Sequence, residues 1–294
     1  MKERIFQVAG LRFALRMPEG CPVWDHLRNY DPFSMPADAP ASPDLFTLTL
    51  SDTAPQGSRE PLFRAPEEAG EPVVSLDRCE GGYVAEFSPY PGAPICGQFA
   101  MSGDFRQGTL FTEGCPSDMT FAVNNALMME YAFASAPFQA LEMHASVVTC
   151  SGRGFLFLGR SGTGKSTHSR LWLKYIEGAE LLNDDNPVLR VVDGTVRVFG
   201  TPWSGKTPCY KAQDAPAGAI IRLRQAPANR IERLGTVAAY ASVMASCSGF
   251  RPIRSIADAQ HETLVAVVQG VPCYQLDCLP DEAAARLCKS TVDE

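Results

Sequence analysis

Alternation of apolar and polar residues dominates the first 118 residues of the chain. Six segments place apolar side chains at every second position, the period of a strand with one buried face: 4–9, 11–15, 45–50, 73–78, 82–88 and 108–113. Segments 27–44 and 53–72 are rich in Pro, Asp, Ser and Ala and predict loops, and the CEGG sequence at 79–82 predicts a hairpin turn. We therefore expect a β-rich N-terminal domain over residues 1–118, with a role in docking an acceptor as one hypothesis.

The pattern changes after residue 118. Segment 121–136 is apolar nearly all round and stops before Pro137, which predicts a buried helix. Strands are then predicted at 144–148, 154–159 and 180–182, with a helix at 165–176 between the last two. A hairpin follows at 187–199, and the last part of the chain predicts helices at 236–247 and 281–289 with a strand at 271–277 between them. This alternation predicts an α/β nucleotide-binding domain over 119–294, and an α+β chain overall.

Composition narrows the class of protein. With 45% hydrophobic residues the chain can bury a sizeable core, and a net charge of −7 without runs of Lys or Arg argues against nucleic acid or an anionic membrane surface as a partner. The sequence offers neither an 18-residue apolar stretch nor a secretory leader, so we expect a cytoplasmic protein. Ten scattered cysteines without a CxxC pair favour reduced thiols. Whether the chain forms a homo-oligomer stays open.

One short segment carries a phosphate-binding motif. Residues 159–166, GRSGTGKS, fit the P-loop (Walker A) pattern G-x-x-x-x-G-K-[ST] between an apolar strand and an amphipathic helix. Glycine backbones let successive N–H groups surround phosphate oxygens, and the helix points its positive end at the anion. We expect MgATP here, with Lys165 on the β and γ phosphates and Ser166 on Mg²⁺. The predicted nucleotide-binding residues are Gly159, Arg160, Ser161, Gly162, Thr163, Gly164, Lys165, Ser166 and Thr167.

Two adjacent aspartates follow the motif. Asp184 and Asp185 lie 19 and 20 residues after Lys165, enough for one helix and a return on a neighbouring parallel strand by a right-handed crossover. Their carboxylates would then emerge beside the loop at the carboxyl ends of the strands. Extended neighbours point apart, so we assign them different roles: one aspartate takes a proton from an attacking hydroxyl and the other binds Mg²⁺. The alternative is that the NDDNP segment is a polar turn in which Asn183 or Asp185 only caps the chain.

A histidine and a second lysine complete the candidate catalytic set. If 144–149 and 154–159 pair about a CSGRG turn, Thr149 faces Phe155 and His144 faces Arg160, which brings the imidazole to the mouth of the loop. Lys206, in the GTPWSGK segment, is a candidate for neutralising phosphate charge in the transition state. A structural histidine and a solvated lysine are the corresponding alternatives.

The combination of HASVV, GRSGTGKST and NDD, in this order and spacing, resembles the C-terminal catalytic domain of the HPr kinase/phosphorylase family. That core is similar to the core of ATP-dependent phosphoenolpyruvate carboxykinases. The resemblance covers about residues 140–206 and implies His144 at the loop, Asp184 as the base and Asp185 as a metal ligand. Where such kinases usually carry an acidic residue after the loop serine, this chain has Thr167 and His168. It therefore looks more like the broad group of HPr-kinase-related proteins, some of which resemble kinases acting on free serine or on serine in modified peptides.

We therefore expect a kinase that transfers the γ-phosphoryl group of MgATP to a serine-type hydroxyl. A protein or peptide acceptor is favoured over a small molecule. Asp184, His144, Lys165 and Lys206 form the predicted catalytic set, and Ser166 and Asp185 the predicted metal ligands. The alternatives are a nucleotide-binding regulatory module without turnover and a kinase of free serine.

Overall fold

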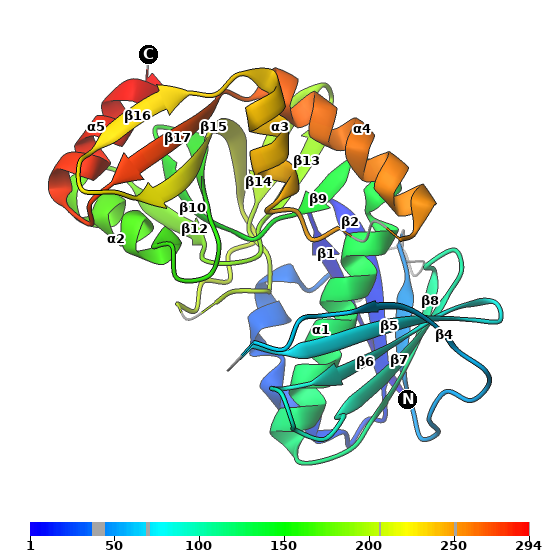
Figure 1. Cartoon of the computed structure of the whole chain (residues 1–294). Helices are drawn as coiled ribbons and strands as arrows, with labels where there is room; N and C mark the ends of the chain where they lie inside the picture. Colours follow the sequence, from blue (N-terminus) through cyan, green and yellow to red (C-terminus); the bar gives the residue numbers. More distant parts are fainter. Residues whose placement is uncertain (37–44, 69–70, 206, 250–251, 294) are drawn as a thin grey trace. The chain divides into compact units, whose positions relative to one another are not determined.

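The computed structural model describes residues 1–36, 45–68, 71–205, 207–249 and 252–293. The chain is a mixed α/β protein that divides into two compact units, Met1–Ser135 and Ala136–Glu294. Each unit has its own sheet, drawn in Figure 1. None of the described helices combines the length and apolar composition that crossing a bilayer requires. All ten cysteines are free thiols, and six of them are buried.

The first unit is built on eight described strands in the order β1-β2-β3-β8-β7-β6-β5-β4. Their bounds are β1 Lys2–Val8, β2 Leu11–Met17, β3 Thr47–Ser51, β4 Glu60–Arg64, β5 Val73–Cys79, β6 Gly82–Ser88, β7 Gly97–Ser102 and β8 Gln107–Thr112. The six predicted strands and the hairpin turn at 79–82 are confirmed. Strands β4 and β7 were not predicted. The 3-10 helix η1 Pro22–His26 precedes the first expected loop, and a second one, η2 Arg28–Phe33, occupies part of that loop.

One long helix, α1 Pro116–Ala134, packs on this first sheet. The contact is close because glycines of β7 and β8 face the helix: a Cβ added to Gly97 would lie 2.7 Å from the Cβ of Ala122. From the same helix, Tyr131 Oη donates a hydrogen bond to the carbonyl of Val8 at 3.1 Å. The helix therefore belongs with the first sheet, and the division falls at 135/136 instead of the expected 118/119.

The second unit contains a sheet of nine described strands in the order β12-β10-β11-β15-β14-β13-β9, with β17 beside β15 and β16 beside β17. The strands are β9 Ala140–Glu142, β10 Ala145–Cys150, β11 Arg153–Leu158, β12 Glu180–Asn183, β13 Val188–Val192, β14 Thr195–Phe199, β15 Asp214–Gln225, β16 Arg230–Arg233 and β17 Cys273–Cys278. A short 3-10 helix, η3 Ala136–Phe138, precedes β9, and the predicted hairpin of β13 and β14 is confirmed.

Helices cover both faces of this second sheet (Figure 1). Alternate residues of β11 enter two separate cores: Phe155 and Phe157 pack with Trp172 of α2, whereas Leu156 and Leu158 share a core with Val243 of α3. Helix α5 joins the first core and α4 joins the second. The helices are α2 Lys165–Tyr175, α3 Thr236–Met244, α4 Arg254–Gly270 and α5 Glu282–Asp293. Of these, α4 was not predicted.

Two expectations about the second sheet are wrong. First, β10 and β11 turn through Ser151 and Gly152, both with positive φ, so Thr149 faces Gly154 and the expected register is off by one residue. A two-residue turn suits the twist of a hairpin better than the longer turn that we expected. Second, β12 does not adjoin β11, because β10 lies between them, antiparallel to both.

Candidate functional site

The glycine loop, residues 159–164, connects the end of β11 to the start of α2. Gly162 and Gly164 have φ of +77° and +109°, conformations that side chains with a Cβ rarely adopt. The loop closes on itself through a hydrogen bond from Thr163 N to the carbonyl of Arg160, 3.1 Å long. A glycine-permitted turn at a helix N-terminus directs backbone N–H groups at one point, which suits a polyanion.

Strand order explains which side chains meet at this loop. Strands β11 and β12 are parallel to one another with β10 reversed between them. The start of β10 therefore lies at the same edge as the carboxyl ends of β11 and β12. His144 and Ser146 come from the start of β10, Lys165 follows β11, and Asp184 and Asp185 follow β12. The sheet brings these five residues together although they are spread over 42 positions of the sequence.

A chain of polar contacts links the loop lysine to one aspartate through the histidine. Lys165 Nζ lies 2.7 Å from His144 Nε2 and donates to the carbonyl of Gly159 at 2.9 Å. On the other side of the ring, His144 Nδ1 lies 3.1 Å from Asp185 Oδ1. An ammonium group can only donate, so His144 Nε2 accepts from protonated Lys165, and Nδ1–H donates to Asp185. The histidine thereby holds the lysine and the aspartate at a fixed separation.

Burial sets the electrostatics of the lysine. Lys165 is only 8% exposed, and this desolvation lowers the pKa of its ammonium group below the ordinary 10.5. The carboxylates of Asp185 and Asp184 oppose the shift, since negative charge favours the protonated lysine.

Asp184 and Asp185 lie in different surroundings. Asp184 is 4% exposed, and its Oδ1 accepts a 3.0 Å hydrogen bond from Ser146 Oγ, which in turn lies 2.6 Å from Ser169 Oγ. Its Oδ2 is buried and has no hydrogen-bond partner among the described residues. The Asp185 side chain is 30% exposed, and its Oδ2 accepts from Asn186 Nδ2 at 3.1 Å. Asp184 Oδ2 is thus the carboxylate oxygen with unused acceptor capacity.

Asn183 fixes the backbone that carries both aspartates. Its Oδ1 accepts from Asp185 N at 2.9 Å, and its Nδ2 donates to Thr201 Oγ1 and to the carbonyl of Trp203, each at 3.1 Å. The segment around Gly205 lies against Asp185, because a Cβ added to Gly205 would be 3.2 Å from the Asp185 Cβ. The neighbouring candidate Lys206 lies outside the described residues.

The remaining predicted nucleotide-binding residues lie in the loop or in the first turn of α2. Arg160, Ser161 and Thr167 are exposed, and Ser166 is half-buried in the first turn of α2. Ser146 and Ser169 were not predicted, whereas the capping role left open for Asn183 is observed in the hydrogen bond that its Oδ1 accepts from Asp185 N. Ser146 is a single serine on the otherwise apolar strand β10 and carries no motif.

The sequence matches no protein-family model and no curated protein. Among solved structures, the chain is similar to the HPr(Ser) kinase/phosphatase from Coxiella burnetii. The similarity covers 52% of this chain and 93% of that chain, at 14% sequence identity and a TM-score of 0.30. This is a distant structural resemblance to a kinase/phosphatase.

Proposed function

We propose that the second unit is a phosphotransferase that moves the γ-phosphoryl group of MgATP to a serine-type hydroxyl. One observation carries the proposal: an N–H-rich glycine loop, a buried lysine and two carboxylates meet at one edge of the sheet, with His144 bridging Lys165 and Asp185. This set supports phosphoryl transfer, since a loop and a cation can hold the phosphate charge while a carboxylate activates the hydroxyl. A protein or peptide acceptor is favoured, with free serine as the alternative.

Asp184 is the proposed base. Its Oδ1 is held by Ser146, which orients the carboxylate, and Oδ2 keeps the acceptor capacity for one proton. Oδ2 takes the proton of the acceptor hydroxyl while the hydroxyl oxygen bonds to the γ-phosphorus. The bond from that phosphorus to the β–γ bridging oxygen breaks, and the nucleoside diphosphate leaves with the electron pair. Lys165 stabilises the negative charge that develops on the phosphate oxygens.

The residues present fit a divalent cation. The Asp185 carboxylate, 30% exposed, and the half-buried Ser166 hydroxyl are oxygen donors of the kind that Mg²⁺ prefers. We propose Ser166 and Asp185 as the residues that hold it. Bound there, the cation would neutralise phosphate charge.

Transfer of label from γ-labelled ATP tests the proposal. Purified full-length protein is incubated with MgATP and either free L-serine or serine-containing peptides, and labelled acceptor is measured. Asp184→Asn should reduce transfer by about a hundredfold or more, because loss of a general base has that size of effect. MgATP affinity should change little. Asp193→Asn is the matched control, because Asp193 is exposed in the β13–β14 turn and should leave transfer unchanged.

The same assay distinguishes the proposed roles of Asp184 and Asp185. Asp185→Asn should raise the Mg²⁺ concentration needed for half-maximal transfer, whereas Asp184→Asn should lower the maximal rate. MgATP binding without label in any acceptor, unaffected by Asp184→Asn, would contradict a transferase. That result would favour a nucleotide-binding regulatory module.

A further inference from the structure

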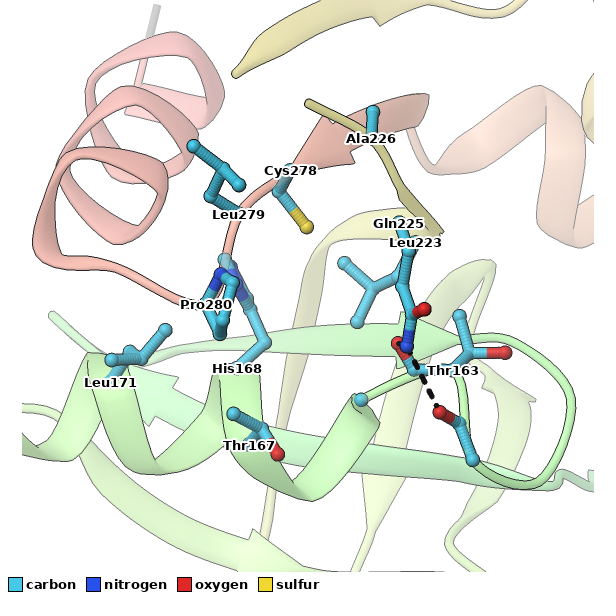
Figure 2. A pocket seen from close by; sticks show the side chains of 12 residues that line it. Thr163, Thr167, His168, Leu171, Leu223, Gln225, Ala226, Cys278, Leu279 and Pro280 are labelled. Atoms are coloured by element: carbon cyan, nitrogen blue, oxygen red, sulfur yellow. Dashed lines mark hydrogen bonds between the residues drawn. The ribbon is translucent and has the colours of Figure 1, made fainter. Parts of the chain in front are cut away.

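One side chain from a neighbouring strand holds the outer side of the glycine loop. Gln225 is the last residue of β15, and its Nε2 donates hydrogen bonds to the carbonyls of Gly162 at 3.2 Å and of Thr163 at 3.4 Å. Figure 2 shows the Gln225 side chain beside Thr163, at the wall of a 480 Å³ cavity that adjoins the loop. Because carbonyl oxygens only accept hydrogen bonds, the two carbonyls fix the Gln225 amide with its nitrogen toward the loop.

The two carbonyls belong to consecutive peptide groups whose N–H groups face the other way. The described peptide bonds are trans, and in a trans peptide the C=O and the N–H point in opposite directions. The Gly162 carbonyl shares its peptide group with Thr163 N, which donates across the loop to the carbonyl of Arg160. The Thr163 carbonyl shares the next peptide group with Gly164 N, which has no acceptor among the described residues. With the Thr163 carbonyl held by Gln225, this N–H stays directed at the inner side of the loop, where a phosphate oxygen would lie.

The end of β15 gives this contact a fixed support. Strand β17 pairs with β15 as far as Gln225, and Ala226 N donates to the carbonyl of Cys278 at 3.2 Å. One residue before Gln225, Arg224 contacts both oxygens of one carboxylate: its Nε donates to Asp277 Oδ1 at 2.7 Å and its Nη2 donates to Oδ2. A forked arginine–carboxylate pair fixes orientation as well as distance. Gln225 therefore extends toward the loop from a backbone that the sheet holds in place.

A loop of this composition benefits from such a support. Three of the six residues 159–164 are glycine, and glycine loses more conformational entropy than other residues when its backbone becomes ordered. A contact that orders the loop beforehand reduces this cost of binding. We propose that Gln225 is a positioning residue that keeps the glycine loop in its phosphate-binding shape before the ligand arrives. The inference rests on the phosphate-binding part of the proposed function.

Calorimetry of the full-length protein with magnesium tripolyphosphate tests this role. Tripolyphosphate has the phosphates of ATP without the nucleoside, so it reports on the loop alone. Gln225→Met keeps the length of the side chain, adds no charge and removes both donated hydrogen bonds, and it should weaken binding by about tenfold. Gln213→Met is the matched control, because Gln213 is also exposed and directly precedes β15 at its other end. It should leave the affinity unchanged.

Backbone order parameters, measured by NMR on the unliganded protein, give a second readout that a merely structural role would not move. In Gln225→Met, the values for the N–H groups of Thr163 and Gly164 should fall from about 0.85, typical of rigid backbone, to below about 0.6. The values along β15 and β17 and the melting temperature should stay at those of the wild type. A merely structural role would instead lower the melting temperature or loosen the strands.

The outcomes separate this inference from the proposed function. Binding by Gln225→Met within about twofold of the wild type, or wild-type order parameters in its loop, would overturn the positioning role. An equal loss of affinity in Gln213→Met would also overturn it. No binding of tripolyphosphate by the wild type would overturn both proposals. Binding that depends on Gln225, without transfer from MgATP to any acceptor, would support the positioning role and contradict only the transferase.

Discussion

At the scale of single residues, adjacent side chains do different work because the strand alternates. Asp184 turns inward to Ser146, whereas Asp185 turns to His144. The sequence predicted this divergence, since extended neighbours point to opposite sides. It did not predict Ser146, because a lone serine on an apolar strand carries no motif. Only the buried distance between Ser146 Oγ and Asp184 Oδ1 identifies it as a positioning residue.

Lys165 gives a prediction at the same scale. Because burial lowers its pKa, the lysine loses its charge at a lower pH than the ordinary 10.5. A protonated lysine favours phosphate, so affinity is retained below the lowered pKa and falls as pH rises through it. We expect calorimetric affinity for magnesium tripolyphosphate to fall by up to about tenfold per pH unit on the alkaline side. Lys165→Gln should bind more weakly throughout and lack this fall. Parallel pH profiles for the two proteins would contradict the assignment.

At the scale of elements, local pattern predicted most of the strands and helices whose buried residues are apolar, with strand β7 as an exception. Helix α4 was not predicted because two of its buried positions, Gln260 and Thr263, are polar and interrupt the apolar periodicity. Strand β12 was placed beside β11 because the 19 residues from Lys165 to Asp184 allow that crossover. The spacing cannot reveal that the earlier strand β10 lies between the two. The carboxyl ends of β11 and β12 nevertheless share one edge of the sheet, so Lys165, His144 and Asp185 come into contact.

The loop conformation supports a second prediction. Gly164 has a φ of +109°, and an added Cβ meets nothing closer than 4.0 Å, so Gly164→Ala introduces backbone strain alone. That strain is about 1–2 kcal/mol and should be relieved by moving the loop, which weakens nucleotide binding. We expect about a five- to thirtyfold loss of MgATP affinity by calorimetry, which is the factor that this free energy corresponds to.

Gly178→Ala is the control for this loop variant. Gly178 has a φ of +73° and open space around it, and it follows α2 outside the loop. It should lower the melting temperature as much as Gly164→Ala does while leaving MgATP affinity unchanged. Similar affinity losses in both variants would show that general strain is responsible.

At the scale of the whole molecule, the division into units depends on contacts that local sequence does not reveal. Segment 121–136 was assigned to the second domain because the strand pattern ends before it. Its partners are Gly97 and Gly108, whose missing side chains admit the helix. Glycines in strands usually indicate turns or bulges. Their local pattern does not reveal that a helix later in the sequence packs against them.

The same helix buries a carboxylate whose ionisation should control the stability of the first unit. Glu130 lies over Gly108 with no hydrogen-bond partner among the described residues, and burial, then the charge of Asp104, raises its pKa well above 4.5. The folded state therefore binds the proton more tightly, and stability falls as pH rises from the unfolded pKa toward the folded one, by about 1.4 kcal/mol per pH unit. Glu130→Gln cannot ionise, so its melting temperature should exceed that of the wild type by a margin that grows as the pH rises above the ordinary carboxyl pKa of 4.5. Glu19→Gln, at an exposed position of the same unit, should show no such growth. A margin for Glu130→Gln that is constant with pH would mean that the carboxylate finds a charge-stabilising partner on folding.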